Sequence, residues 1–440
     1  MKIKLKIPKG LYAHMLEDLK RPHSFAFERV GFAYSTTTIV DEDTVIISLK
    51  DYQPVKDECY IETDEVGAKF NADSIRDAMQ ICLDKQWGGF HVHLHNHKGL
   101  PFPSKDDEQG LPSVIESLTN VAADQACGVL ILSKDSFYAS VVVKGTVHWV
   151  EPELISVIGY PMKFQFCNKK SYLDEDRASR QSFLGEDSEC LLSEVRVGIV
   201  GLGGGGSHMA QQLAHIGVRN ITVFDDDVIE MSNLNRLIGA QHNDIKNKEF
   251  KVAIASRLIK SILPQANVTE IKARWQERCE ELQKCDIILG CVDTYLARQQ
   301  LEAECRRFLI PFIDIGMDVF ESNDCAYHMS GQVILSMPGM ASMKSMGFLT
   351  DEKLAAEAAK YGNAGGRPQV VWPNGVLASS AIGVLIDLLT GWSKECDKLV
   401  YLSYDGNSGT VNPHIRLNFI DPDLSEYDLR DAGRVVFTKM

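Results

Sequence analysis

Histidine, serine and aspartate side chains are concentrated in one short segment of the first third of the chain. The segment holds His91, His93, His95, His97, Ser104, Asp106 and Asp107. Alternate residues of a β-strand point to the same face, so alternating histidines can gather on one side of a strand. Two neutral imidazoles and one carboxylate with an open fourth position form a catalytic zinc site. A surface histidine run with adventitious metal binding is the alternative, and the downstream serine and aspartates favour the zinc site.

A glycine-rich turn is the second feature that indicates chemistry. Residues 197–207 read VGIVGLGGGGS, an apolar strand followed by a turn and the start of a helix. The turn contains Gly201, Gly203, Gly204 and Gly206. Such glycines let the backbone approach a phosphate at a helix N-terminus. The acidic run Asp225–Asp227 ends the next expected strand, where a carboxylate binds ribose. A nicotinamide-binding domain and a solvated acidic turn remain alternatives on these residues alone.

Several ordered motifs after residue 174 decide against the nicotinamide alternative. They resemble the motifs of the ubiquitin-activating, ThiF and MoeB superfamily, over about residues 174–400. Residues 225–236 read DDDVIEMSNLNR, which is similar to the family's D-x-D-x-V-x-x-S-N-L-N-R with Ile229 in place of valine. The other similar segments are RASRQ at 177–181, Lys251-Val252, CVDTYLAR at 291–298 and IPFIDIG at 310–316. A nicotinamide-dependent oxidoreductase would share only the glycine turn.

The resemblance implies that ATP adenylates the C-terminal carboxylate of a small β-grasp protein, either ubiquitin-like or a sulfur carrier. Cations must then neutralise the phosphates. By resemblance, Asp225 and Asp227 hold the ribose, Asn235, Arg236 and Lys251 face the phosphates, and Asp293 holds Mg²⁺. Arg180 would reach the triphosphate of a partner subunit, which implies a homodimer. We expect Arg298 to be an ion-pair or helix residue rather than a ligand, and Asp314 to be structural.

One segment departs from that family, many members of which carry a C-x-x-C zinc pair just after a Pro-Gly turn. Here Pro338-Gly339 is followed by Ser342 and Ser345, and neutral serine is a poor zinc ligand. Residues 340–372 contain no cysteine, and we expect a long mobile segment with a short helix there. Either the chain adenylates without a thioester, or the serines are engineered replacements for cysteines. Cys325 is the nearest thiol, and we expect it to be buried or incidental.

The histidine segment resembles the JAMM (JAB/MPN) metalloprotease motif, an upstream glutamate followed by H-x-H-x₇-S-x₂-D, over about residues 10–150. By resemblance, His95, His97 and Asp107 bind Zn²⁺, with His93 as the alternative ligand and Asp106 as a weaker alternative to Asp107. Ser104 would orient the water or the oxyanion, and Glu28 would be the general base. Six residues separate His97 from Ser104, and eight separate His95 from Ser104. We favour His95 and His97, because the proline-rich loop before Ser104 can absorb a one-residue deletion.

The elements that must position these residues fall into two patterns. Before residue 165 strands dominate, which indicates an α+β domain. Its expected strands are Val30–Tyr34, Thr44–Leu49, Val129–Leu132, Ala139–Val143 and Thr146–Val150. Its expected helices are Asp73–Lys85, capped by Asp73, and Ser113–Ala126, capped by Ser113, with Ser104 capping a short helix over Lys105–Gln109.

After Val195 strands and helices alternate, which predicts a Rossmann-like α/β domain with a mostly parallel sheet covered by helices. Its expected strands begin with VRVGIV and continue with Asn220–Phe224, Val268–Ile271, Asp286–Cys291 and Pro311–Ile315. Its expected helices are Ser207–Ile216, Phe250–Ile262, Thr294–Phe308 and Pro373–Thr390. The predicted domains are therefore 1–165 and 174–440, joined by a polar junction.

Length, charge and cysteine usage limit the setting. The 440 residues carry 46 Lys and Arg against 60 Asp and Glu, a net charge of −14, which disfavours a nucleic-acid coat protein. Eleven irregularly spaced cysteines favour a reducing cytoplasm over a disulfide framework. No signal peptide or membrane-spanning stretch is expected.

We therefore predict a bifunctional, cytoplasmic, bacterial enzyme. Its zinc peptidase would trim or remove a β-grasp protein, and its ATP- and Mg²⁺-dependent domain would adenylate that protein, with thioester transfer as an open step. A scaffold protein with a degenerate protease site, which retains only nucleotide binding, is the alternative.

Overall fold

The structure is a computed structural model that describes all residues except 25, 63–66, 144–148, 168–178, 186, 322–325, 360–367, 395–398, 421–426 and 434–440. The chain forms two compact units. The first comprises Met1–Gly159, Lys163–Lys169 and Leu429–Arg434, and the second comprises Tyr160–Met162, Lys170–Asp428 and Val435–Met440. The segment Leu429–Arg434, which we expected in the second domain, therefore belongs to the first unit.

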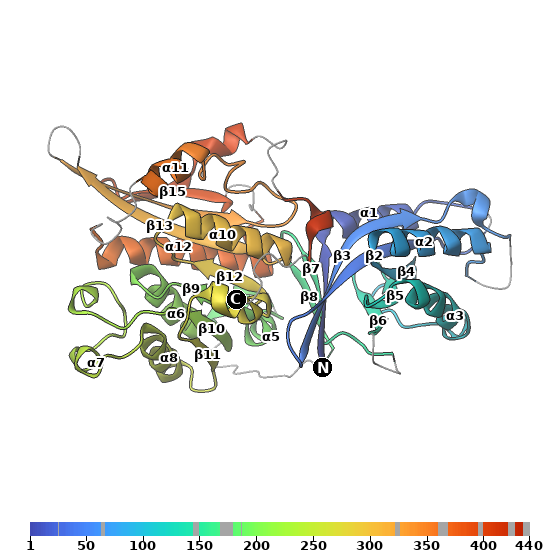
Figure 1. The fold of residues 1–440 in the computed structure, drawn as a ribbon, viewed down its shortest axis with the longest axis horizontal. Helices are drawn as coiled ribbons and strands as arrows, with labels where there is room; N and C mark the ends of the chain where they lie inside the picture. Colours follow the sequence, from blue (N-terminus) through green and yellow to red (C-terminus); the bar gives the residue numbers. More distant parts are fainter. Residues whose placement is uncertain are drawn as a thin grey trace. The chain divides into compact units, whose positions relative to one another are not determined.

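The first unit is built on one eight-stranded sheet of mixed direction, as an α+β pattern requires (Figure 1). The strand order is β6-β5-β4-β2-β3-β1-β7-β8. The strands are β1 Lys2–Pro8, β2 Val30–Ile39, β3 Thr44–Pro54, β4 Gly88–Leu94, β5 Cys127–Leu132, β6 Phe137–Val142, β7 Leu154–Ile158 and β8 Lys163–Phe166. The helices are α1 Lys9–Leu19, α2 Ala72–Lys85 and α3 Lys105–Val121, with a 3₁₀ turn η1 at Asp57–Cys59.

Both faces of this sheet are covered, because its buried apolar residues form two separate clusters. One cluster joins Tyr12, Met15 and Leu19 of α1 to the sheet. The other joins α2 and α3 to the sheet through residues such as Cys82 and Leu118. The histidine-bearing strand β4 lies inside the sheet between β2 and β5, so its backbone is held on both sides.

Two helix starts differ from those predicted. Asn71, not Asp73, caps α2, since its side chain accepts a hydrogen bond from the Ser74 amide. Helix α3 begins at Lys105, where Ser104 and Asp107 form a capping box, which confirms Ser104 as a cap. The predicted helix start at Ser113 is wrong, because the two helices expected over Lys105–Gln109 and Ser113–Ala126 are one helix. Pro112 lies inside α3 and interrupts the sequence signal of a continuous helix. Most of the expected strand at 146–150 lies outside the described residues.

The second unit is built on another eight-stranded sheet, in the order β11-β10-β9-β12-β13-β14-β15-β16. Its strands are β9 Arg196–Val200, β10 Asn220–Phe224, β11 Asn267–Ile271, β12 Ile287–Gly290, β13 Phe312–Glu321, β14 Tyr327–Ser336, β15 Tyr401–Asp405 and β16 Thr410–Pro413. The first five strands are parallel, which confirms the prediction for the part that carries the motifs. The last three pair antiparallel, so the sheet as a whole is mixed.

The helices of the second unit agree closely with the predicted alternation. They are α5 Ser188–Glu194, α6 Gly204–Ile216, α7 His242–Asn247, α8 Lys251–Ile262, α9 Cys279–Gln283, α10 Tyr295–Arg307, α11 Asp351–Ala359 and α12 Val371–Thr390, with 3₁₀ turns η2 Ser179–Leu184, η3 Met231–Asn233, η4 Trp275–Arg278 and η5 Ile415–Phe419. The segment Leu429–Asp431, a 3₁₀ turn η7, follows them in the chain.

Helix α12 is apolar enough and long enough to cross a membrane, by length and composition alone. It packs against α6, β13 and β14, and 61% of its most apolar window is buried within the protein. A core helix accounts for the same composition.

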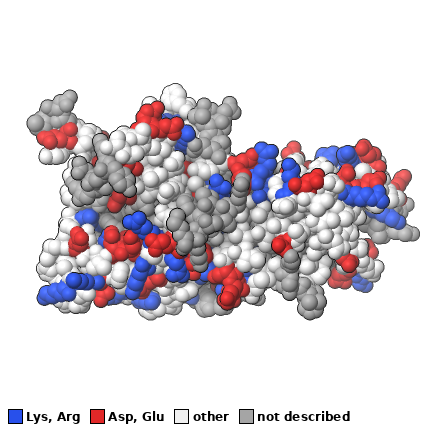
Figure 2. Space-filling view, viewed as in Figure 1, with Lys and Arg blue, Asp and Glu red and all other residues white. Residues whose placement is uncertain are grey.

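On the face drawn in Figure 2, acidic and basic side chains are interspersed.

The turn after β14 corrects the expectation of a long mobile segment over 340–372. Met343, Met346 and Leu349 are buried in the core of the second unit. Buried Arg306 donates hydrogen bonds to the carbonyls of Met340 and Ala341, at 3.0 and 2.7 Å. Residues 340–349 are therefore packed structure, α11 supplies the predicted short helix, and residues 360–367 lie outside the described part of the chain.

The segment 429–433, which belongs to the first unit, leads to a first prediction about the stability of that unit. Ala432 is 2% exposed, Gly433 accepts a hydrogen bond from Thr38, and the Arg430 carbonyl accepts one from Lys50. We expect Ala432→Glu to destabilise the first unit by about 2 kcal/mol or more, because it buries a carboxylate at a position where alanine packs and no polar partner is provided for it. Thermal unfolding of the full chain measures this, with the exposed neighbour Asp431→Ala as the control. An unchanged melting temperature for Ala432→Glu would contradict the packing of this segment.

Candidate functional sites

The glycine turn connects β9 to α6 and needs glycine at two positions. Gly201 has a φ of +89°, a left-handed conformation that other residues adopt at a cost. A Cβ atom on Gly206 would lie 1.9 Å from the Gly201 carbonyl oxygen, so the turn closes only around glycine. Helix α6 begins at Gly204, three residues before the predicted start, because the glycines themselves form its first turn.

The N-terminus of α6 is suited to a phosphate. Gly203 is its N-cap, and no side chain caps the helix. A Cβ atom on Gly203 would meet nothing within 4 Å, so open space lies beside this end of the helix. The first amides of a helix have no intrahelical acceptor, and they carry partial positive charge toward such a space. The turn therefore fits a nucleotide phosphate.

Asp225 ties the glycine turn to the acidic run. Its carboxylate accepts hydrogen bonds from the Leu202 amide at 2.6 Å and from the Asp227 amide at 2.9 Å. The Asp225 side chain is 8% exposed. Burial raises the pKa of Asp225 and outweighs the opposing effects of Lys251 and of the backbone amides. This carboxylate is thus held at a fixed position beside the turn.

Lys251, the first residue of α8, lies next to both acids expected to hold the ribose. Its Nζ lies 2.6 Å from an oxygen of Asp227 and 3.7 Å from an oxygen of Asp225. The Lys251 side chain is 11% exposed, whereas Asp227 is 66% exposed. A largely buried lysine beside Asp225, which bonds to the glycine turn, is placed to contribute positive charge to a phosphate site.

Most of the remaining residues of the adenylation motif are described. Asn235 donates to the Gln369 carbonyl at 3.1 Å, and Arg236 donates to the Ser232 carbonyl at 2.7 Å. The Nε atom of Arg236 is buried without a hydrogen-bond partner, which leaves a donor for a ligand. Asp293 follows β12 and is exposed. Arg180 is exposed in η2, and Arg177 lies outside the described residues.

Sheet topology brings these residues to one edge. Strands β10, β9 and β12 are parallel neighbours, with Phe224 opposite Val200 and Val200 opposite Gly290. The glycine turn, the acidic run and Asp293 follow the carboxyl ends of these three strands. The chain order reverses between β9 and β12, which is where open α/β sheets bind ligands.

Two expectations about structural residues are confirmed. Arg298 Nε lies 3.2 and 3.0 Å from the two carboxylate oxygens of Asp314, and both residues are buried. Burial raises the pKa of Asp314 to about 7 even though Arg298 opposes the shift.

Ser342 and Ser345 are also buried, and their hydroxyl groups are 2.9 Å apart. Neutral hydroxyls that bond to each other do not fit a zinc ion, so no step involves a metal there.

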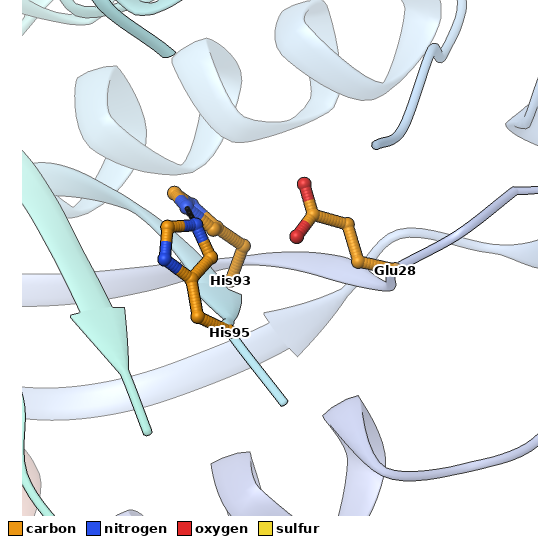
Figure 3. A group of neighbouring side chains, drawn as sticks. All are labelled: Glu28, His93 and His95. Atoms are coloured by element: carbon orange, nitrogen blue, oxygen red, sulfur yellow. Dashed lines mark hydrogen bonds between the residues drawn. The ribbon is translucent and has the colours of Figure 1, made fainter. Parts of the chain in front are cut away.

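The first unit contains a separate cluster at the end of β4. His93 Nε2 and His95 Nε2 are 3.2 Å apart, and they lie 3.4 and 3.5 Å from the oxygens of Asp107. A carboxylate oxygen of Glu28 lies within 4.8 Å of both imidazole donors, and Figure 3 shows it pointing toward the two rings. Asp106 is exposed beside Asp107 and contributes no described contact to this group.

The spacing of the three donors fits one zinc ion. Zinc bonds of about 2.0–2.2 Å at tetrahedral angles separate neighbouring ligand atoms by about 3.3–3.6 Å. The two Nε2 atoms are 3.2 Å apart, and His93 and His95 lie 3.4 and 3.5 Å from different oxygens of the Asp107 carboxylate, so each separation is close to that range. His93, His95 and Asp107 therefore form an N, N, O set with room for a fourth ligand.

The preferred histidine pair, His95 and His97, is corrected by this geometry. Strand β4 ends at Leu94, and the His97 amide donates to the His95 carbonyl at 2.8 Å, so the chain turns there. His97 is exposed, and its Nδ1 lies 2.8 Å from the Lys98 carbonyl oxygen. Strand alternation thus stops after His95, and His93, the alternative ligand, takes the place of His97.

Ser104 and Asp107 are fixed to each other at the start of α3. The Ser104 amide and hydroxyl donate to one Asp107 oxygen at 2.8 and 2.7 Å. Burial acts to raise the pKa of Asp107, but hydrogen bonds from His93, His95 and Ser104 lower it overall. The carboxylate is therefore charged, as a zinc ligand must be.

Glu28 lies in the loop between α1 and β2, where the sequence placed it. The amides of Phe27 and Glu28 both donate to the Gly67 carbonyl, at 2.8 and 3.0 Å. A Cβ atom on Gly67 would lie 2.3 Å from a Glu28 carboxylate oxygen, so Gly67 packs directly on that carboxylate. Burial raises the pKa of Glu28, with His93 opposing, which suits a proton acceptor.

Sequence reasoning missed Gly67 and Glu357 at these sites and assigned no separate role to His91. Gly67 contacts Glu28 across a distance in sequence that no local pattern reveals. Glu357 of α11 accepts hydrogen bonds from the Tyr295 and Leu296 amides at 3.0 Å each, and so caps α10 just after Asp293. His91 was seen only as one of four alternating histidines. Burial lowers its pKa to about 3, so it is a neutral imidazole.

Comparisons with known proteins address the second unit. The family model described as "ThiF family" matches residues 176–419. The molybdopterin-synthase adenylyltransferase of Haemophilus influenzae is 33% identical over 168 residues, which are 37% of this chain and 65% of that protein. The sulfur carrier protein ThiS adenylyltransferase of Escherichia coli is 30% identical over 142 residues, which are 31% of this chain and 56% of that protein.

Another relative shows the same limited coverage. Ubiquitin-like modifier-activating enzyme 5 of Dictyostelium discoideum is 30% identical over 34% of this chain and 40% of that protein. The chain thus spans less than two thirds of the length of these relatives. A crystal structure of E. coli MccB with ATP superposes with a TM-score of 0.45 at 20% identity, over 55% of this chain and 72% of that chain. The match over residues 176–419 covers more than half of the sequence, and the chain belongs to the ThiF family.

Proposed function

We propose that the second unit is an ATP- and Mg²⁺-dependent adenylyltransferase for the C-terminal carboxylate of a small β-grasp protein, either ubiquitin-like or a sulfur carrier. The observation that carries this proposal is the uncapped glycine turn at α6, with Asp225 and Lys251 fixed beside it. Curated relatives are named for activation of molybdopterin synthase, of ThiS and of ubiquitin-like modifiers.

In the proposed reaction, the carboxylate attacks the α-phosphate of ATP and pyrophosphate leaves. The α6 amides and Lys251 bind and orient the phosphates, and Arg236 has an unpaired donor for the same purpose. Asp225 and Asp227 hold the ribose. Asp293 would hold Mg²⁺, which supplies charge neutralisation for the leaving pyrophosphate. Glu357 caps α10 immediately after Asp293 and fixes the start of that helix.

ATP–pyrophosphate exchange tests this proposal, with β-grasp proteins encoded beside the gene as substrates. We expect exchange with one of them, and a loss of about 100-fold or more for Asp293→Ala. Asp226→Ala is the matched control, because its exposed carboxylate lies 3.3 Å from exposed Arg274. Wild-type exchange by Asp293→Ala would contradict the role of Asp293, and no exchange with any neighbouring partner would contradict adenylation.

The proposed enzyme adenylates without forming a thioester on the segment after β14. Residues 340–372 contain no cysteine, and Ser342 and Ser345 are buried against each other. Cys325, the nearest other thiol, lies outside the described residues. We place the protein in the bacterial cytoplasm as a homodimer in which Arg180 reaches the partner's ATP, which agrees with the exposure of Arg180. Absence of a thiol-sensitive covalent complex between the chain and its β-grasp substrate in the presence of Mg²⁺-ATP would support the thioester-free route.

A second function is supported by the cluster in the first unit. We propose that it is a JAMM-type zinc peptidase that trims or removes the same β-grasp protein. His93, His95 and Asp107 would hold the metal, Ser104 orients Asp107, and Glu28 would take the proton from the attacking water and return it to the leaving amine. Zinc, when bound, lowers the pKa of that water and polarises the scissile carbonyl.

Metal analysis tests this second function. We expect about one zinc per chain in the wild type, none in His95→Ala, and a full complement in His97→Ala, the matched control whose ring lies outside the cluster. Stoichiometric zinc in His95→Ala would contradict the assigned ligands. A wild-type protein that holds no zinc would support the alternative of a scaffold that retains only nucleotide binding.

A further inference from the structure

His91 lies on β4 two residues before His93, the first of the proposed zinc ligands, and aromatic side chains surround it. It is 4% exposed and sits on β4, opposite Phe32 of β2 and Val129 of β5. Its ring stacks on Phe70 with centroids 6.0 Å apart and meets Phe32 edge-on at 5.9 Å. These aromatic contacts fix the plane of the imidazole.

The polar contact of His91 is with His93, one of the proposed zinc ligands. His91 Nδ1 lies 3.4 Å from His93 Nδ1, while His93 Nε2 faces His95 and Asp107. One nitrogen of His93 therefore points into the donor set, and the other points at His91. The three imidazoles follow one another along the strand, with ring centroids 5.3 and 4.9 Å apart.

The proton count on His93 follows from this arrangement. If His93 Nε2 gives its lone pair to a metal, the single proton of the neutral ring is on Nδ1. That N–H then needs an acceptor, and a neutral imidazole offers one lone pair on one of its two nitrogens. Ligating histidines usually donate this second N–H to a carboxylate, a carbonyl or water. Here the atom within reach is Nδ1 of a buried, stacked imidazole.

We propose that His91 is a positioning residue for the metal site, accepting the Nδ1–H of His93 and so holding His93 with Nε2 free for zinc. This inference rests on the proposed peptidase function. His91 Nδ1 carries the lone pair, and its own proton is on Nε2. The rings of Phe70 and Phe32 hold His91 in place beside His93.

Two substitutions separate this role from packing. His91→Phe keeps a flat ring for the aromatic stack and removes the hydrogen-bond acceptor. His91→Asn keeps an acceptor near the position of Nδ1 and removes the ring. Zinc affinity is measured by chelator competition, and the ligand field by the absorption spectrum of the Co²⁺-substituted protein. Thermal unfolding of the metal-free variants shows that each one folds.

We expect His91→Phe to weaken zinc binding about 10- to 100-fold and to change the Co²⁺ spectrum, and His91→Asn to remain close to wild type. Wild-type affinity in His91→Phe, or equal losses in both variants, would overturn the proposal. His95→Ala tests the underlying site independently. If it binds zinc as tightly as the wild type, the peptidase assignment itself fails. If His95→Ala loses zinc while His91→Phe does not, only the role of His91 fails.

Discussion

Replacing Asp225 with asparagine is expected to weaken ATP binding by about 10- to 100-fold. The carboxylate accepts two backbone hydrogen bonds, from Leu202 at 2.6 Å and from Asp227 at 2.9 Å. Asparagine can accept only one of them, and its NH₂ group would then face the other N–H. Because the Leu202 amide belongs to the glycine turn, the phosphate cradle loosens together with the proposed ribose contact.

Isothermal titration of Mg²⁺-ATP into the full chain measures this effect without any protein substrate. Asp226→Asn is the matched control, since Asp226 is next in sequence but pairs with Arg274 at the surface, where such an ion pair contributes little. We expect wild-type affinity for the control. Equal affinities for Asp225→Asn and Asp226→Asn would show that the buried carboxylate has no part in nucleotide binding.

The parallel half of the second unit could be predicted from sequence because its signals are local. The observed β10 has the predicted bounds, and α8 and α10 begin one residue after the predicted starts. Apart from β11, whose sequence is NVTEI, the parallel strands contain short apolar runs, and the helices between them have helical spacing of apolar residues. The antiparallel strands β14 to β16 were not predicted, because the alternation of strands and helices in a parallel α/β domain gives no signal that the strand direction will change.

The histidine cluster of the first unit shows which residues local sequence patterns cannot assign. Strand alternation placed several histidines on one face, which is correct for His91, His93 and His95. The choice of His95 and His97 depended on loop length, and a loop length does not reveal where a strand ends. The turn after Leu94 excludes His97, and the eight-residue loop from His95 to Ser104 bridges the remaining distance.

The segment after β14 was misjudged for a different reason. Its composition, rich in Met, Ala, Ser and Gly, is typical of mobile loops, but its partners lie far away in sequence. Arg306 and Glu302 of α10 bind its backbone, including the Met343 amide at 2.8 Å from a Glu302 oxygen. Such long-range polar contacts to a loop leave no periodic pattern, so sequence reasoning could not find them.

Replacing Arg298 with methionine is expected to destabilise the second unit by about 3–5 kcal/mol at pH 8. The guanidinium Nε lies 3.0 Å from Asp314, whose side chain is completely buried. Methionine fills similar volume, so the loss comes from the charge rather than from a cavity. An unpaired carboxylate in that position has no solvent and no cation to stabilise it.

The size of this loss is expected to depend on pH in one direction. Burial already raises the pKa of Asp314 to about 7 in the wild type, and removing Arg298 raises it further. A carboxyl group whose pKa is raised on folding contributes stability below its unfolded pKa of about 4, and that contribution is lost as pH rises through the folded pKa. The difference between Arg298→Met and the wild type should therefore be smaller at pH 5, where the variant can protonate Asp314, than at pH 8.

Chemical denaturation of the full chain between pH 5 and pH 8 measures this difference. Arg274→Met is the control, because Arg274 and its partner Asp226 are both exposed, and we expect less than about 1 kcal/mol at either pH. A loss that is independent of pH would mean that Asp314 stays protonated throughout and that Arg298 contributes by packing. A loss that grows toward low pH would contradict the buried ion pair, since only an uncompensated carboxylate is relieved by protons.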